Sequence, residues 1–398
     1  MRRALVISFV TAAASAACAG SACTKPPGQE ATPPQAATHV TPTTSPRDLD
    51  AAFDAQALLD ASRDGGGETS YANVSDDPYA IHHDTKEELL AMIELRPMTD
   101  KEKANIRPDL FLNLNVGQNY TRMNQGNKAV AKHSIGQRTC LEGLKGIVLQ
   151  TEEQKAQCKG MPNMVPIYRK GDKGSATYCI DQFEFPNKPC ELPFVWAAPA
   201  FAQTMCKLQG KRLCSDKEWN TACSADPAGG PDTKFAYGDT MDLTICNTNK
   251  ARPDPPTCNG LAVKSAWETC GTDTEPAGAY PKCRSRFNVF DHHGNVAEIM
   301  TRKEEDGTVY TQLKGSAFFY VDVSRQPGEP QKPDSKQTYP DHCNFDPRWH
   351  VEPMATAGYH VNYHLGFRCC MGIAPTNASS SAPDAGKAPA PATSSAAP

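Results

Sequence analysis

The fold of this 398-residue chain is decided by five short blocks, which read Tyr178-Cys-Ile-Asp-Gln-Phe-Glu184, Gly210-Lys-Arg-Leu-Cys-Ser-Asp-Lys-Glu-Trp219, Phe287-Asn-Val-Phe-Asp291, Gly294-Asn-Val-Ala-Glu298 and Leu365-Gly-Phe-Arg-Cys-Cys370. Around them, the apolar runs are short and are interrupted by Gly, Pro, Asn and Cys. The first block predicts a strand, and residues 199–209 and 215–223 predict amphipathic helices. Ser215, with Glu218 three residues later, has the spacing of a helix cap. These patterns predict a loop-rich α+β domain.

Residues 49–160 predict a small, mainly helical region before this domain. Three short helices are expected in it, at 48–63, 84–96 and 99–107. Asp84 with Glu87, and Thr99 with Glu102, have the spacing of capping boxes. Because the helices are short and amphipathic, we expect them to pack on the larger domain instead of folding alone.

The two ends of the chain carry patterns that do not belong to a folded core. Residues 1–17 place two arginines before an apolar run, which predicts a signal peptide and an exported protein. Residues 18–48 are rich in Pro and Thr and predict an extended tether. Residues 374–398 are mainly Ala, Pro and Ser and predict a disordered tail.

Cys18 follows Ser15-Ala-Ala in a context that resembles a bacterial lipoprotein cleavage site. This context predicts lipidation of Cys18 and attachment to a membrane through the lipid. Ordinary signal cleavage near Ala16 is the alternative. The predicted location is the periplasm, the outer membrane or the cell surface.

Fourteen cysteines lie between Cys140 and Cys370. None of them forms the two-residue-spaced pairs that zinc ribbons use. Because an exported protein folds in an oxidising compartment, we expect most of these cysteines to form disulfides that staple the domain. Their pairing cannot be read from the sequence.

Taken together, the five ordered blocks resemble the formylglycine-generating enzyme, or sulfatase-modifying factor, family. The resemblance covers residues 161–373. It implies an irregular α+β fold related to the C-type lectin fold, together with structural calcium. For active members it implies a copper site that uses oxygen to convert a cysteine of a substrate protein to formylglycine.

The block Gly294-Asn-Val-Ala-Glu298 is the predicted calcium site, since the resemblance assigns it that role. Calcium is bound by carboxylate, amide and carbonyl oxygens. Glu298 and Asn295 can supply the first two kinds, and the backbone of Gly294 or Val296 the third, while Asn247 is a candidate for a second ion. The alternative is that Asn295 and Glu298 only satisfy a glycine-led turn.

Cys343 is the candidate catalytic residue. Active members of the family place two cysteines five residues apart shortly before the Gly-Phe-Arg block, but the residue five positions after Cys343 is Arg348. A lone cysteine cannot form the two-thiolate site that copper(I) prefers. A disulfide is the alternative fate of Cys343.

Four histidines lie within 23 residues of one another around Cys343, namely His342, His350, His360 and His364. His360 and His364 are four residues apart, which is a metal-ligand spacing when both lie on a helix. They are candidate ligands of a transition metal, and solvated loop histidines are the alternative.

Two functions follow from these patterns. The first is a cell-envelope lipoprotein whose sulfatase-modifying-factor-like domain binds a protein or glycan partner as a scaffold. The second is a copper- and oxygen-dependent oxidoreductase that acts on a protein cysteine through Cys343. The formal net charge of −4, with no cluster of Lys or Arg, argues against nucleic acid as a partner.

Overall fold

The computed structural model describes residues 71–106, 122–248, 250, 263–319, 342–346, 351–354 and 361–374, all within the compact unit Ala52–Pro398. The predicted signal peptide, tether and first helix, the tail beyond residue 374, and Cys18, His350 and His360 lie outside these ranges. Among the helices in these ranges, none is long and apolar enough to cross a membrane.

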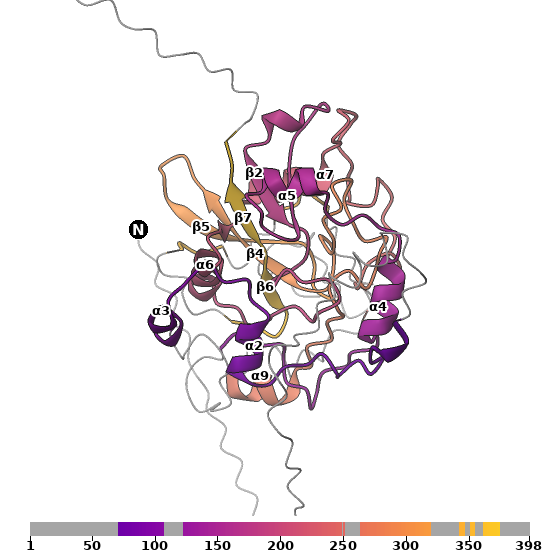
Figure 1. Ribbon diagram of the computed structural model, residues 1–398, viewed down its shortest axis with the longest axis vertical. Coiled ribbons are helices and arrows are strands. Elements are labelled where there is room, and N and C mark those ends of the chain that lie inside the picture. Colours follow the sequence, from indigo (N-terminus) through magenta and orange to yellow (C-terminus); the bar gives the residue numbers. More distant parts are fainter. Residues whose placement is uncertain are drawn as a thin grey trace, which may run out of the picture. The chain divides into compact units, whose positions relative to one another are not determined.

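Short helices and strands are connected by long loops (Figure 1). The α-helices are α2 (Lys86–Ala91), α3 (Asp100–Ala104), α4 (Gln137–Leu144), α5 (Glu152–Gln157), α6 (Pro199–Leu208), α7 (Asp216–Ser224) and α9 (Val263–Thr269), and the 3-10 turns are η2 (Tyr71–Asn73) and η4 (Lys173–Ser175). The strands are β1 (Met164–Pro166), β2 (Tyr178–Asp181), β3 (Arg212–Leu213), β4 (Ala297–Lys303), β5 (Val309–Lys314), β6 (Leu365–Phe367) and β7 (Cys369–Gly372). This mixture confirms the α+β class, while the relationship to the C-type lectin fold stays a prediction.

The strands form two small sheets. One is antiparallel with the order β1-β2-β7-β3, and the other has the order β5-β4-β6, in which β4 and β6 are parallel. β6 and β7 follow one another with only Arg368 between them, so the chain passes from one sheet to the other at this residue (Figure 1). The glycine just before this passage is required, because a Cβ at Gly366 would lie 2.6 Å from Val296 Cγ2 and 2.9 Å from Phe194 O.

The predicted helices of the larger domain are confirmed. α6 buries Phe201 and Met205 on one side. α7 starts at the predicted cap, where Ser215 Oγ accepts from the Glu218 backbone N–H and the Glu218 carboxylate accepts from the Ser215 N–H. Both hydrogen bonds of this cap join residues within one helical turn, which is why the pattern could be read locally.

The second and third helices predicted for the N-terminal region are confirmed with corrected ends. The predicted box of Thr99 and Glu102 begins α3. At α2 the prediction of Asp84 with Glu87 was wrong by one residue, because Thr85 Oγ1 accepts from the Glu88 N–H and the Glu88 carboxylate accepts from the Thr85 N–H. α2 also ends at Ala91, five residues before the predicted end. After this end, the Arg96 N–H donates to the backbone oxygen of Leu208, the last residue of α6.

These helices pack on the larger domain, as expected. Leu89, Met92 and Ile93 of the α2 region belong to the same apolar core as Phe194 and Phe367. The N-terminal helices therefore bury their apolar side chains against segments that lie more than a hundred residues away in sequence.

Disulfides staple the domain, which confirms that prediction. Every cysteine in the described part of the chain is disulfide-bonded. Six bonds have both partners described, and they join Cys140–Cys190, Cys158–Cys179, Cys206–Cys369, Cys214–Cys370, Cys223–Cys343 and Cys246–Cys283.

Candidate functional site

Arg368 lies at the passage between the two sheets, and its guanidinium is completely buried. Its Nε donates to Glu298 Oε2 at 2.7 Å, and its Nη atoms donate to Phe290 O at 2.9 Å and Asp181 O at 3.2 Å. Trp219 Nε1 also donates to Glu298 Oε2, at 2.8 Å. Because a buried ion pair needs all its hydrogen bonds to offset desolvation, this network is suited to holding the sheets and α7 in register.

Asn295 is also saturated with hydrogen bonds. Its Oδ1 accepts from Asn247 Nδ2 at 2.9 Å and from the Glu275 N–H at 2.8 Å. Its Nδ2 donates to the Glu184 carboxylate and to Glu275 O. The adjacent Gly294 has φ +80° and allows the turn, since a Cβ there would lie 2.3 Å from Asn247 O. The structure thus brings Asn247, Gly294 and Asn295 together, but directs Glu298 to Arg368.

The buried charge around Arg368 is not balanced. The carboxylates of Glu184, Asp291 and Glu298 are all buried near a single guanidinium. Burial, together with the charges of Asp291 and Glu298, raises the pKa of Glu184 well above its ordinary value. Burial also raises the pKa of Asp291 to about 7, although the Gly278 N–H and Arg368 act against the rise. The burial of these carboxylates therefore favours their protonated forms or a neutralising cation.

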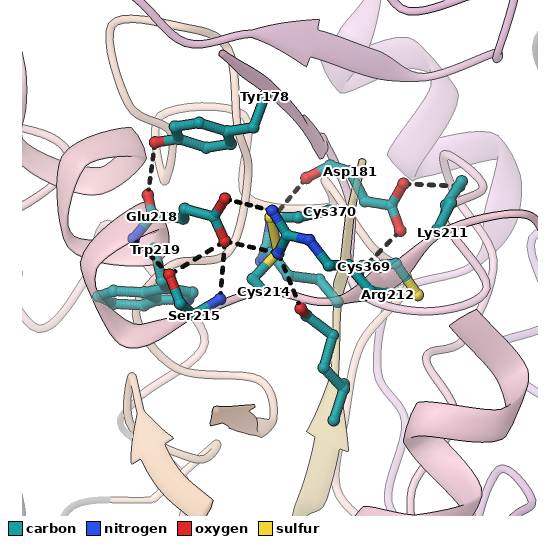
Figure 2. The surroundings of a disulfide bond; sticks show 12 residues. Tyr178, Asp181, Lys211, Arg212, Cys214, Ser215, Glu218, Trp219, Cys369 and Cys370 are labelled. Atoms are coloured by element: carbon teal, nitrogen blue, oxygen red, sulfur yellow. Dashed lines mark hydrogen bonds and ion pairs between the residues drawn. A yellow bond between two sulfur atoms is a disulfide. The ribbon is translucent and has the colours of Figure 1, made fainter. Parts of the chain in front are cut away.

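The doublet Cys369-Cys370 joins the two faces of its sheet. Because side chains alternate along a strand, Cys369 bonds to Cys206 of α6 on one face and Cys370 bonds to Cys214 on the other. Figure 2 shows one ion pair on each side of the doublet. In the first, the Lys211 ammonium contacts Asp181 at 2.7 Å, and in the second, the Arg212 guanidinium contacts Glu218. The doublet is structural.

The carboxylate pair Asp181 and Glu184 is structural as well. Asp181 Oδ1 accepts from Lys211 Nζ and Oδ2 accepts from the Cys369 N–H at 3.0 Å. Glu184 binds the turn of the predicted calcium block through the Val296 N–H and the Asn295 amide. Both acids therefore anchor neighbouring segments of the chain.

Residues 179–371 match the family model of the sulfatase-modifying factor enzyme 1-like domain. The chain carries a domain of this family. No curated protein shows a significant match. A solved structure described as "Crystal Structure of CarF" is 13% identical over 46% of this chain and 68% of that chain, with a TM-score of 0.27, from which we draw nothing.

Within the sulfatase-modifying factor domain, the predicted calcium ligands fit an ion only in part. Glu298 and Asn295 use their side-chain oxygens in the hydrogen bonds above. Asn247 Oδ1, however, is buried and makes no hydrogen bond within the described ranges. The unbalanced carboxylates also favour a cation. Calcium therefore stays a prediction, and a bound ion would have to replace hydrogen bonds that Asn295 and Glu298 now make.

Cys343 is not a free thiol in this structure. It is bonded to Cys223 of α7, and both residues are at most 1% exposed. In neither direction does a cysteine lie five residues from Cys343, since position 338 is threonine and position 348 is arginine. As long as the bond is formed, neither sulfur is a thiolate, so these residues do not fit copper.

The histidine beside Cys343 is one that the sequence analysis missed. His293 Nε2 lies 3.6 Å from Cys223 Sγ and accepts from the Ala236 N–H at 3.0 Å. Cys223, His293 and Cys343 form the one group of possible metal ligands found among the described residues. The available signal was the buried pair His292-His293 in front of the Gly294 turn, fifty residues before Cys343 in sequence.

The predicted histidine cluster is only partly described. His342 contacts the ring of Phe345, and His364 packs against Phe319 and Tyr363. His364 does not belong to the Cys223, His293 and Cys343 group. His360 lies outside the described residues, so the proposed His360 and His364 pair stays untested.

Proposed function

We propose that this chain is an exported, lipid-anchored envelope protein whose sulfatase-modifying factor domain binds a protein or glycan partner and does not catalyse cysteine oxidation. The observation that carries the proposal is the buried Cys223–Cys343 disulfide. Copper-dependent oxidation needs thiolate ligands, and Cys343 has its sulfur covalently occupied. A rigid, disulfide-stapled scaffold with long loops is well suited to presenting a binding surface.

Peptide mass spectrometry tests this proposal. The oxidised full chain is incubated with copper and oxygen in the presence of a Cys-x-Pro-x-Arg peptide, beside a Cys343→Ser variant. No aldehyde product, with Cys343 recovered in a peptide disulfide-linked to Cys223, supports the binding function. Conversion of the peptide cysteine by the parent chain and not by the variant would refute it.

The second candidate function is the copper-dependent oxidoreductase. It is favoured by one observation, the position of His293 Nε2 beside the two sulfurs. If a dithiol reductant opened the bond, Cys223 and Cys343 would supply two thiolates and His293 an imidazole, a donor set that suits copper(I) or zinc. Copper would then supply the oxygen chemistry, while the three side chains would hold it.

Reduction of the parent chain with a dithiol that is removed before copper is added separates the two candidates, since it frees the Cys223 and Cys343 thiolates together. A reduced chain that still makes no aldehyde supports the binding function. Aldehyde formation by the reduced parent chain, lost in a reduced Cys223→Ala variant, would favour the oxidoreductase, with the disulfide as its inactive form.

Calcium is part of the proposal. We infer that a cation neutralises the buried Glu184 and Asp291 carboxylates, with Asn247 Oδ1 as a further oxygen ligand. Melting of the full chain with 1 to 5 equivalents of calcium and with a chelator tests it. A melting temperature that rises with calcium and falls with the chelator supports the ion, and identical curves argue against it.

Export and anchoring rest on the first 18 residues and on the disulfides, which are compatible with an extracellular protein. Fatty-acid labelling of the parent chain and of a Cys18→Ser variant distinguishes lipidation from ordinary cleavage near Ala16. The relationship of the fold to C-type lectins also belongs to this proposal, supported by the two small sheets joined by long loops.

A further inference from the structure

A cavity of about 530 Å³ opens between two segments of the sulfatase-modifying factor domain. One wall is formed by 233–238 and the other by 282–288, with Ile245 between them. This volume lies within the range of small-molecule sites. None of the residues predicted from the sequence as ligands or catalysts lines it.

Three basic residues line one wall of this cavity, namely Lys282, Arg284 and Arg286. They alternate in sequence with the buried residues Cys283, Ser285 and Phe287. Ser285 lines the cavity beside them. Positive charge is therefore concentrated on a single wall.

The basic wall is held rigidly. Cys283, between the first two cations, is bonded to Cys246 beside Ile245. Ser285 pairs with Val289 across a tight turn, through an N–H to O bond of 2.9 Å. A wall fixed in this way loses little conformational freedom when a ligand binds.

Two of the three cations have no carboxylate partner within the described chain. Arg286 is paired, because its Nη1 lies 2.8 Å from Asp226 Oδ2. Among the described residues, Lys282 and Arg284 make no ion pair. Lys282 is only a minor cause of the lowered pKa of Asp242, because the main causes are the hydrogen bonds that the Asp242 carboxylate accepts from Thr244. Burial lowers the pKa of Arg284 with no acidic group acting against it.

The opposite wall supplies an aromatic ring. Tyr237 stacks on Phe235 with the ring centroids 5.5 Å apart and meets the edge of His293. The same segment accepts a hydrogen bond from the Cys343 N–H through Lys234 O, at 2.9 Å. The cavity thus lies next to the Cys223–Cys343 disulfide.

We propose that this cavity binds the oxyanion of a small ligand or ligand segment with two negative charges, held by Lys282 and Arg284. A guanidinium binds a carboxylate or a sulfate through parallel N–H donors, and an ammonium adds a second charge. Ser285 Oγ accepts from the Phe287 N–H at 3.3 Å, so its own O–H is available to donate. The inference rests on the proposed binding function and gives the chemical class of its ligand.

Calorimetric titration of the full chain, with its disulfides formed, tests the inference. The probes are succinate, inorganic sulfate, an acetylated Asp-Glu peptide amide, and succinamide as the uncharged control, all at one ionic strength. We expect saturable binding of at least one of the charged probes and none of succinamide. Comparison of the affinities for succinate and sulfate shows whether the cavity prefers a carboxylate or a sulfate. The peptide shows whether the acidic side chains of a protein segment are enough for binding.

Substitutions locate the site. We expect Arg284→Gln to weaken binding about tenfold or more and Lys282→Gln about fivefold, as expected for the loss of one charged hydrogen bond each. Arg284→Lys keeps the charge and should recover part of the affinity. Lys207→Gln removes an exposed charge from α6, outside the cavity, and should leave the affinity unchanged.

Absence of saturable binding for all three charged probes would overturn the inference. So would equal affinities of the parent, Lys282→Gln and Arg284→Gln chains, since exposed Lys282 can be changed without disturbing the fold. Because the titration detects binding and the peptide assay detects an aldehyde, failure of this inference is distinguishable from failure of the proposed non-catalytic function.

Discussion

Removal of the Cys223–Cys343 bond is the perturbation that reports most directly on function. We choose the double variant Cys223→Ala and Cys343→Ala, because alanine leaves no thiol and buries no unsatisfied hydroxyl. Both positions are buried in the core on which α7 packs. The expected result is a stable fold with a much lower free energy of unfolding.

The magnitude follows from the loop that the bond closes. The two cysteines are 120 residues apart in sequence, but Cys214–Cys370 already constrains the chain on both sides. Cys223 lies 9 positions after Cys214 and Cys370 lies 27 positions after Cys343, so the effective loop is about 36 residues. The chain-entropy relation then predicts that the bond stabilises the fold by about 4 kcal/mol, compared with about 5 kcal/mol for an unconstrained loop of 120 residues.

Guanidinium denaturation of the oxidised parent and variant measures this difference. The matched control is the double alanine variant of Cys158 and Cys179, whose loop of 21 residues predicts a loss of about 3 kcal/mol. Thiol labelling in denaturant without reductant accompanies both measurements. We expect no reactive thiol at Cys343 in the parent chain.

Two results would refute this reasoning. A loss below about 1 kcal/mol in the Cys223 and Cys343 variant, with the control losing its expected amount, would mean that the bond does not constrain the chain. A labelled Cys343 in the unreduced parent would mean that the thiol is free, and the oxidoreductase would become the favoured function.

Three further predictions concern the buried charges around Arg368 and the cap of α7. Arg368→Met should lower the free energy of unfolding by about 3 to 5 kcal/mol in urea denaturation, because it leaves Glu298 charged and unpaired in the core. Adding Glu298→Gln to this variant should recover part of the loss, and no recovery would contradict the pairing. Ser215→Ala should cost about 1 kcal/mol by the same measurement through loss of the α7 cap, and an unchanged midpoint would contradict the cap. Since the pKa of Asp291 rises from 3.8 to about 7 in the folded chain, the native state keeps a proton that the unfolded chain loses, so this group's contribution to stability falls as pH rises from about 4 to 7. Asp291→Asn keeps the acceptor for the Gly278 N–H and removes the titrating carboxyl. The stability of the variant relative to the parent should therefore increase by about 2 kcal/mol from pH 5 to pH 7 without added metal, and parallel pH profiles would contradict the raised pKa.

Local features of the fold were predictable because their causes lie within a few residues. The cap at Ser215 needs only Glu218 three positions later, and the apolar side of α6 recurs at helical spacing through Phe201 and Met205. The error at α2 shows the limit of such patterns. Asp84 and Thr85 both suit a cap, and the choice of Thr85 depends on which of two adjacent glutamates reaches back to it.

The candidate site could be predicted only in part. The turn at Gly294 was accessible from the family blocks, but the contact of Asn295 with Asn247, which the sequence had suggested for a second ion, was not. The pairing of Glu298 with Arg368 was not, because 70 residues separate the two in sequence. Nor was the neighbourhood of Cys343, since His293 lies far before it in the chain and carries no spacing signal.

The sequence by itself determined the family domain, the α+β class, the helix caps and the presence of many disulfides, because composition, periodicity and ordered blocks encode each of them locally. Only the tertiary structure decided which cysteine bonds to Cys343, which cation neutralises Glu298 and which basic residues share a cavity wall. These pairings depend on loop closure over tens to hundreds of residues, and the free energy that selects among the possible closures comes from burial in the assembled core.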